Sequence, residues 1–300
     1  MSLSDAPRRP FPLAALAAMR PKQWTKNGLL FFGLIFSSHF TDPHAVMRAC
    51  LAFVSFSLLS STGYVYNDYR DIESDRKHPK KRFRPLASGE VGNGGAWLIM
   101  GVAATAALAI AAWLGPWFVA VALAYFVTTL SYSSYFKHLV ILDVMVLAAC
   151  YLWRAVAGAV AIGVPPSPWL LVCTTFGALF LGFNKRRGEI RLLEGKAHGT
   201  RKSLDHYSPA MLQEFQAITT SGTIISYAVY TVQSLTPLLG LTLPYVVYGV
   251  FRYIYLIDQK GEGAAPDETL LKDRPILITA FLYLVTAVAV LLFSHPHPPG

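Results

Sequence analysis

The sequence predicts an all-α protein that crosses a membrane about nine times. Its 300 residues are 54% hydrophobic and only 14% charged, whereas about a quarter of the residues in a soluble domain carry charge. Apolar stretches recur along the whole chain, and several reach the roughly 20 residues that a helix needs to cross the hydrocarbon core. No segment between them is long enough for a soluble domain to fold alone. Residues 1–300 are therefore expected to form one transmembrane domain.

The N-terminal segment, residues 1–26, is expected to lie on the membrane surface. Four prolines interrupt it, and its one apolar run, Leu13 to Met19, is short and is followed by Arg20. This pattern does not fit a secretory signal peptide. It favours a helix that lies in the membrane interface.

The spans that follow are predicted from hydropathy. In chain order they cover 27–41, 45–66, 95–113, 116–134, 139–161, 168–184, 212–233, 236–257 and 275–294. The first is short, and the fifth contains charged residues. Cys50, Cys150 and Cys173 fall inside spans without the spacing of metal ligands, and we interpret them as packing residues.

Lysine and arginine lie almost entirely on one side of the predicted membrane. Of the 26 basic residues, 24 fall in the N-terminal segment and in alternate loops, and the exceptions are Arg48 and Arg154. Cytoplasmic loops of membrane proteins are enriched in basic residues. The chain is therefore expected in a cytoplasmic (inner) membrane, with its N-terminus and basic loops in the cytoplasm. Asp143 lies near the cytoplasmic end of its span, whereas Arg154 is expected to make a structural contact between helices.

A cluster of acidic residues directly follows the second span. If the helix continues at about 100° per residue, Asp68, Asp71 and Asp75 fall on one stripe. Asn67 lies one turn before Asp71, while Glu73 points away. Carboxylates stacked in this way repel one another unless a cation lies among them, and oxygen ligands suit Mg²⁺. The alternative is a solvated helix end paired with arginine, but ionisable groups beside a span are usually functional. The three aspartates are thus candidate catalytic residues, and with Asn67 they are candidate Mg²⁺ ligands.

A run of basic residues comes next in the chain and contains Lys81, Arg82 and Arg84. Cations beside an acidic metal site are expected where a polyphosphate lies between them. The metal then bridges some phosphate oxygens, and the arginine side chains bind others. These three residues are therefore candidate substrate-binding residues on the cytoplasmic side.

These motifs resemble those of the UbiA superfamily of intramembrane prenyltransferases. The residues that carry the resemblance are Asn67-Asp68-x-x-Asp71-x-x-x-Asp75, Lys81-Arg82-x-Arg84-Pro85-Leu86-x-Ser88-Gly89, Tyr132-Ser133 and Lys137. The resemblance covers nearly the whole chain, including the span layout. It implies a helical barrel around a central cavity, with cytoplasmic cap loops and a lateral opening for a lipid chain. Tyr132 and Lys137 become candidate substrate-binding residues, although aromatic residues are also enriched at membrane interfaces.

The sequence departs from the usual superfamily pattern after the sixth span. Aromatic prenyltransferases of this superfamily carry a second Asp-rich motif there, so that two Mg²⁺ ions hold a prenyl diphosphate. This chain instead has Lys185, Arg186 and Glu189, with Glu189 as the one acid within a helical turn of the two cations. These residues favour an anion clamp, positioned partly by Glu189, over a second carboxylate site. Arg201 and Lys202 add further cations.

The altered second motif is similar to the branch of the superfamily that transfers phosphoribose to decaprenyl phosphate. Three further segments agree with it: Arg20-Pro-Lys22-Gln-Trp24-Thr-Lys26-Asn27, Arg201-Lys202-Ser203-Leu204 and Pro266-x-Glu268-x-Leu-Leu-x-Asp273-Arg274-Pro275. The resemblance implies phosphoribosyl diphosphate as donor, a polyprenyl phosphate as acceptor, Mg²⁺ as cofactor and a role in cell-wall precursor synthesis. Lys22 and Lys26 become candidate phosphate-binding residues.

Two other functions stay open. A transferase that uses a prenyl diphosphate and an aromatic acceptor would share the fold, but the missing carboxylates of the second motif count against it. A lipid-phosphate transporter would need polar groups on both sides of the membrane, whereas the charged groups lie on one side. The acceptor phosphate is ionised at neutral pH, so phosphoribosyl transfer needs no general base. Self-association in the membrane is compatible with these features, and no nucleic-acid partner is expected.

Overall fold

The computed structural model describes residues 9–78, 81–193, 202–234, 236–260 and 266–294. Every regular element in these ranges is helical, which confirms the all-α prediction. In chain order they are α1 (Phe11–Met19), η1 (Pro21–Leu29), α2 (Leu30–Phe36), α3 (Pro43–Arg70), α4 (Ile72–Lys77), η2 (Lys81–Phe83), α5 (Asn93–Leu114), α6 (Pro116–Ser134), η3 (Phe136–His138), α7 (Leu142–Ala161), α8 (Pro168–Leu193), η4 (Lys202–His206), α9 (Pro209–Gln233), η5 (Pro237–Thr242), α10 (Leu243–Lys260), α11 (Pro266–Lys272) and α12 (Arg274–Ser294).

Among the described residues, six helical segments are long and apolar enough to cross a membrane. They are Pro43–Arg70, Asn93–Leu114, Pro116–Ser134, Leu142–Ala161, Pro237–Gln259 and Arg274–Phe293. They define a multi-pass membrane protein, but the predicted count of nine spans is not confirmed. The predicted first span, 27–41, is divided between the end of η1 and α2, which has only seven residues.

Helices α8 and α9 also differ from the prediction of simple apolar spans. They have 26 and 25 residues, which is long enough to cross, yet neither is among the six apolar segments. Polar side chains face one another between them: Gln216 of α9 donates to Asn184 of α8 at 2.6 Å. Both side chains are buried. The surfaces on which α8 and α9 face each other therefore contain hydrogen-bonded polar residues as well as apolar ones.

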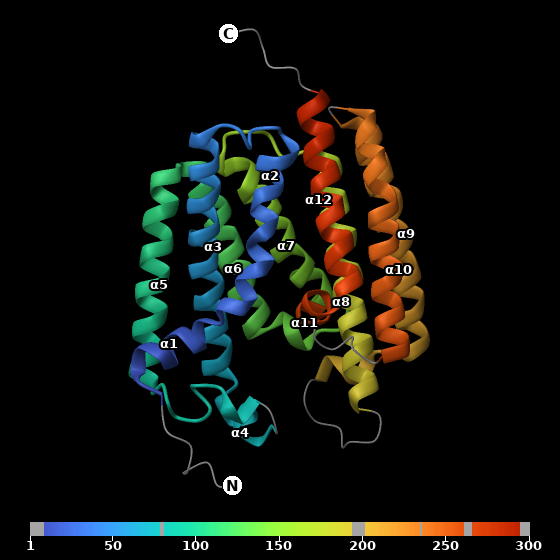
Figure 1. Cartoon of the computed structure of the whole chain (residues 1–300). Helices are drawn as coiled ribbons and strands as arrows, with labels where there is room; N and C mark the ends of the chain where they lie inside the picture. Colours follow the sequence, from blue (N-terminus) through green and yellow to red (C-terminus); the bar gives the residue numbers. More distant parts are fainter. Residues whose placement is uncertain (1–8, 79–80, 194–201, 235, 261–265, 295–300) are drawn as a thin grey trace.

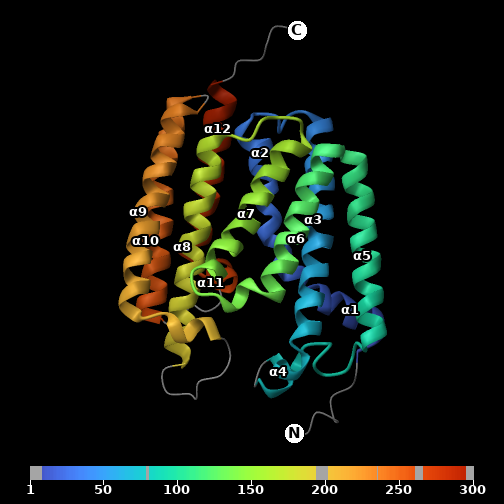
Figure 2. The same cartoon turned by 180° about the vertical axis from the view of Figure 1, so that it is seen from behind.

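The helices form two groups that stand side by side (Figures 1 and 2). The first group contains α2, α3, α5, α6 and α7, and the second contains α8, α9, α10 and α12. Helix α7 packs against α8 and thereby joins the groups. Helix α1 lies across the ends of α3 and α5, close to α4, while α12 ends at the opposite face (Figure 1). This orientation of α1 agrees with the predicted interfacial helix.

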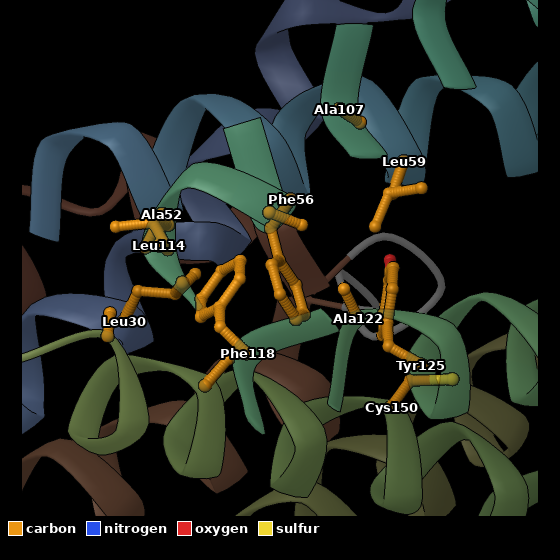
Figure 3. Packing of buried hydrophobic residues seen from close by; sticks show 13 residues of the cluster. Leu30, Ala52, Phe56, Leu59, Ala107, Leu114, Phe118, Ala122, Tyr125 and Cys150 are labelled. Atoms are coloured by element: carbon orange, nitrogen blue, oxygen red, sulfur yellow. The ribbon is translucent and has the colours of Figure 1, made fainter. Parts of the chain in front are cut away.

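Aromatic rings and small residues make up the core of the first group. Phe56 of α3 packs against Phe118 and Tyr125 of α6, with ring centroids 5.8 and 4.8 Å apart (Figure 3). The surrounding alanines, including Ala52 and Ala107, are fully buried. Small residues let helix backbones approach closely, which provides van der Waals contact where lipid removes the hydrophobic driving force.

Arg154 makes the structural contact between helices that is predicted from its position within a span. The residue is 4% exposed, and its guanidinium donates to Asn27 Oδ1 at 2.7 Å, the Cys150 carbonyl at 2.9 Å and the Tyr125 hydroxyl at 2.9 Å. It also lies over the rings of Tyr125 and Tyr151. Arg154 therefore ties η1, α6 and α7 together in the interior.

Arg48, one of the two exceptions to the one-sided charge pattern, closes the ends of two helices. Its Nε donates to the Ala161 carbonyl at the end of α7, and its Nη2 donates to the Leu114 carbonyl at the end of α5, both at 2.5 Å. The last carbonyls of a helix have no partner within it and carry partial negative charge. The Arg48 guanidinium provides hydrogen-bond donors and positive charge for these carbonyls. This role explains why Arg48 departs from the one-sided charge pattern.

Replacing Arg48 by glutamine is expected to lower the free energy of unfolding by about 1 to 3 kcal/mol, because two charge-assisted hydrogen bonds are lost. Thermal unfolding in detergent measures the effect. Arg9→Gln is the matched control, since Arg9 is half exposed and its nearest acidic partner, Glu90, is 3.9 Å away. Equal melting temperatures for the two variants would contradict the capping role.

Candidate functional site

The charged residues singled out in the sequence gather at the end of the molecule where α1 and α4 lie. Two groups are distinguished by their contacts. The first cluster consists of Arg20, Asn67, Asp68, Asp71, Asp75, Arg84 and Lys137. The second cluster consists of Asp143, Arg186, Glu189, Ser203 and Tyr207.

The acidic motif does not lie on one uninterrupted helix as predicted. Helix α3 ends at Arg70, Asp71 has φ −100° and ψ 8°, and α4 begins at Ile72. Asp68 and Asp75 therefore meet around Arg84, whereas Asp71 turns toward Lys137. Among the described residues, no three acidic, histidine or cysteine side chains converge as ligands of one ion. Glu73 points away as expected, with its side chain 82% exposed and paired with Arg76.

Arg84 bridges the two buried carboxylates of the first cluster. Its Nη1 lies 3.0 Å from Asp68 Oδ1 and 2.7 Å from Asp75 Oδ2, and both aspartates are 2% exposed. Arg20 Nη2 also reaches Asp68 Oδ1, at 2.5 Å. Arg20 has φ 54° and ψ 63°, a left-handed conformation that ends α1 and turns its side chain back toward α3.

The first cluster pairs three carboxylates with three cations, yet one carboxylate oxygen is left without a partner among the described residues. Burial raises the pKa of Asp75 above its usual value, and the nearby Arg84 guanidinium offsets part of that rise. Asp68 Oδ2 is buried and has no hydrogen-bond partner among the described residues. An unpartnered buried carboxylate oxygen is costly unless a cation or donor satisfies it. The oxygen donors of this cluster therefore fit Mg²⁺, with Asp68 as the first candidate ligand.

Asp71 forms the other half of the first cluster with a residue from the turn after α6. Lys137 Nζ donates to Asp71 Oδ1 at 2.7 Å, and Asn67 donates to Asp71 Oδ2 at 3.2 Å. Lys137 is only 6% exposed. A buried lysine is stable as a cation when a carboxylate pairs with it. The structure thus brings Lys137 into contact with the acidic motif.

Arg186 is the centre of the second cluster and is fully buried. Its Nε lies 3.0 Å from Asp143 Oδ2, and its Nη1 is paired with Glu189 one turn later on α8. Glu189 therefore positions this cation, as the sequence predicts. Arg186 Nε and Nη2 are both buried without a hydrogen-bond partner among the described residues. Because Nε lies within ion-pair distance of Asp143, Nη2 is the donor that the predicted clamp leaves unused.

Short element η4 attaches to the second cluster through two side chains. Tyr207, which directly follows η4, donates from its hydroxyl to Asp143 Oδ1 at 2.7 Å, and Ser203 lies 3.4 Å from Asp143 Oδ2. Burial and the Asp143 carboxylate both raise the pKa of Tyr207, so its phenol stays protonated and able to donate. Asp143 thus joins α7, α8 and η4 at one point.

The other predicted site residues have less closely defined surroundings. Tyr132 lies within electrostatic reach of Arg186, and Lys81 lies within reach of Asp75. Lys22 and Arg82 are exposed, while Lys26 and Lys185 are half-buried. Arg201 lies outside the described residues, and so does the side chain of Lys202.

Four residues of the clusters were not among the site residues predicted from sequence: Arg20, Asp143, Ser203 and Tyr207. Arg20 and Ser203 belong to segments that carry the resemblance, but nothing in those segments indicates that Arg20 would fold back onto Asp68. Tyr207 follows the basic segment in a region without periodicity. Its only sequence signal is its position a few residues after Arg201 and Lys202.

The fold and these clusters define a polytopic helical membrane protein with two buried clusters of charged residues at one end of its helices. The family model of the UbiA prenyltransferase family matches residues 28–272. This chain belongs to that family.

Relatives with named activities are similar over most of their length. A decaprenyl-phosphate phosphoribosyltransferase of Mycolicibacterium smegmatis is 32% identical, with 93% of this chain and 92% of the relative covered. One from Corynebacterium glutamicum is 31% identical, with 91% and 85% covered. Among solved structures, a UbiA homolog from Archaeoglobus fulgidus bound to GPP and Mg²⁺ has a TM-score of 0.73 at 20% identity, covering 93% of this chain and 99% of that one. The likeness to the solved structure concerns the fold.

Proposed function

We propose that this protein transfers a 5-phosphoribosyl group from phosphoribosyl diphosphate to a polyprenyl phosphate and releases diphosphate. The proposal places the active site on the cytoplasmic side of an inner membrane, within a single transmembrane domain. It is supported by the similarity to two decaprenyl-phosphate phosphoribosyltransferases over more than nine-tenths of this chain.

Buried polar atoms without partners in the two clusters give the proposal structural support in addition to the sequence similarity. The two clusters each contain a buried polar atom without a partner among the described residues, and the two atoms are of opposite kinds. Asp68 Oδ2 is an acceptor beside the predicted metal ligands, and Arg186 Nη2 is a donor in the predicted anion clamp. Buried unpartnered groups are rare because each one costs free energy. A metal-bound diphosphate on one side and a phosphate on the other would satisfy both.

The second cluster also supports a phosphoribosyl donor over a prenyl diphosphate bound by two Mg²⁺ ions. Arg186 occupies its interior, and both acids near it, Asp143 and Glu189, are already paired with that cation. Both oxygens of Asp143 have partners, whereas Asp68 of the first cluster keeps one buried oxygen without a partner among the described residues. Asp143 is therefore a poorer candidate metal ligand than Asp68. A substrate with a 5-phosphate as well as a diphosphate would instead use the cation.

The chemistry needs positioning and electrostatic stabilisation more than proton transfer. The bond between the anomeric carbon and the diphosphate oxygen breaks, the diphosphate keeps the electron pair, and an oxygen of the acceptor phosphate forms the new bond. The acceptor is already ionised, so no residue has to remove a proton. Cations aligned before the reaction stabilise the charge that develops on the leaving group.

We assign the roles as follows. Asp68, Asp71, Asp75 and Asn67 would hold Mg²⁺, which when bound supplies positive charge to the diphosphate. The substrate phosphates would be bound by the cations and polar groups predicted from sequence: Lys22, Lys26, Lys81, Arg82, Arg84, Tyr132, Lys137, Lys185, Arg186, Arg201 and Lys202. Glu189 would position Arg186, and Arg20 would position Asp68.

Purified protein in detergent is expected to move label from radiolabelled phosphoribosyl diphosphate into an organic-soluble polyprenyl lipid. The transfer should require Mg²⁺ and stop when EDTA is added, because the metal neutralises the leaving group. Restoring excess Mg²⁺ should restore it, which controls for damage by the chelator.

The same preparation distinguishes the other functions. Transfer from a labelled prenyl diphosphate to an aromatic acceptor, without phosphoribosyl transfer, would contradict the proposal. So would movement of a labelled lipid phosphate across proteoliposomes with no donor present and no new lipid formed.

A further inference from the structure

We propose that Tyr207 is a positioning residue that holds the turn between α6 and α7 in a strained conformation, and thereby sets Lys137 and Asp143 in the site. This inference rests on the proposed function for its kinetic test, but the clamp itself is a property of the fold. It concerns residues 137–143 and the segment that follows η4.

The turn contains a backbone conformation that an isoleucine rarely adopts. Ile141 has φ 68° and ψ −51°, and the Leu142 N–H donates to the Val140 carbonyl at 2.8 Å. These values describe a γ-turn with positive φ at its centre, which is uncommon and strained. The strain is greater for a β-branched side chain, which crowds its own backbone there.

Packing of the Ile141 side chain does not impose this conformation. The residue is 39% exposed, so the apolar contact it gains is small. A glycine would adopt the same backbone angles without cost. The strained turn must therefore be held by contacts from outside it.

Tyr207 supplies those contacts on both sides of the strained residue. Its hydroxyl oxygen accepts the Ile141 N–H at 2.7 Å, and its O–H donates to Asp143 Oδ1, also at 2.7 Å. The side chain is 5% exposed, so water does not replace these bonds readily. One phenol thus uses its donor and an acceptor position to fix two residues that are two apart in the chain.

The clamped turn lies between residues of both clusters. Lys137, before the turn, pairs with Asp71 at 2.7 Å, and Asp143, after it, pairs with Arg186 at 3.0 Å. Ser203 donates to the Lys137 carbonyl at 3.1 Å. The segment around η4 therefore holds the turn at both ends, and relaxation of Ile141 would move Lys137 relative to Arg186.

The test is the pair of variants Tyr207→Phe and Tyr207→Phe/Ile141→Gly. Removing the hydroxyl should lower kcat/KM for phosphoribosyl diphosphate about tenfold, because the turn relaxes and the cations lose their alignment. KM for the polyprenyl phosphate should change less than about twofold, since the fold around the lipid is unaltered. Glycine at 141 keeps the turn without strain, so the double variant should recover most of the lost kcat/KM.

Rescue by glycine separates positioning from general stability. Glycine does not replace a lost hydrogen bond, so a purely structural loss would persist in the double variant. Tyr227→Phe is the matched control, because this buried tyrosine loses bonds to Thr242 and Tyr283 near the opposite ends of the helices. It should leave donor kinetics unchanged.

Hydrogen exchange of residues 137–146 tests the clamp without any substrate. Exchange should be faster in Tyr207→Phe than in the wild type or in Tyr227→Phe, because the Ile141 N–H has lost its acceptor. Unchanged exchange and unchanged donor kinetics, or a kinetic loss that glycine at 141 does not restore, would overturn the inference. If the wild type transfers no phosphoribose, the proposed function fails while the exchange result still decides the clamp.

Discussion

Replacing Asp68 by asparagine is expected to lower the rate of phosphoribosyl transfer by about a thousandfold, which corresponds to about 4 kcal/mol of transition-state stabilisation. Asparagine keeps the shape of the side chain but removes its charge. The buried Oδ2, which has no partner among the described residues, is then no longer an anionic ligand for Mg²⁺. Arg20 and Arg84 also lose the negatively charged partner with which both of them pair.

The rate should be measured by single-turnover transfer of labelled phosphoribose over a range of Mg²⁺ concentrations. If Asp68 is a metal ligand, the Asp68→Asn variant should need a higher Mg²⁺ concentration and should also have a lower maximal rate. Glu73→Gln is the matched control: Glu73 lies in the same acidic segment, but it is exposed and pairs only with Arg76 among the described residues. It should retain nearly full activity.

Two outcomes would count against the assigned role. If Asp68→Asn retains activity within about threefold, Asp68 does not stabilise the transition state. If both variants lose activity equally, the acidic segment acts through its overall charge rather than through Asp68. A loss accompanied by a lower melting temperature should be repeated with Asp68→Glu, which keeps the charge and is expected to retain more activity than the asparagine variant.

The chemistry of the site follows from sequence more fully than its geometry does. Residue types alone identify the acids of the first motif and the cations of the second, and the ion pair between Arg186 and Glu189 follows from helical spacing. Contacts between distant segments do not. The bond from Arg20 to Asp68 crosses 48 residues and depends on a left-handed residue at the end of α1.

The span count shows the same limit for the fold. Hydropathy identifies long apolar helices that can cross a membrane, because their amino-acid composition is enough to recognise them. It does not reveal that a helix also carries polar residues paired with a neighbouring helix, as Asn184 of α8 and Gln216 of α9 are. It also treats 27–41 as one span, although Asn27 turns into the interior to bind Arg154 while α2 begins only at Leu30.

Replacing Gly158 by alanine is expected to lower the free energy of unfolding by about 3 kcal/mol or more, a large effect for one methyl group. A Cβ at Gly158 would lie 2.1 Å from the Leu30 carbonyl oxygen, a backbone atom that cannot rotate away. Gly33 on the facing helix also has no room for a side chain, because its Cβ would lie 2.8 Å from the backbone of Gly158 and Ala159. Helices α2 and α7 thus touch backbone to backbone, the arrangement that paired small residues permit in membranes.

The close contact between α2 and α7 should affect activity as well as stability, because each of these helices is connected to one of the two charged clusters. Helix α2 continues directly from η1, which starts after Arg20, and α7 carries Asp143 at its first turn. Separating the two helices would shift Arg20 relative to Asp143 and disturb both clusters at once. Gly158→Ala should therefore lower the melting temperature in detergent and also the transfer rate of the protein that remains folded. Gly101→Ala provides the control, since a Cβ at Gly101 of α5 meets no atom within 4 Å. A Gly158→Ala protein as stable as the Gly101→Ala protein would show that α2 and α7 are not held in this close contact.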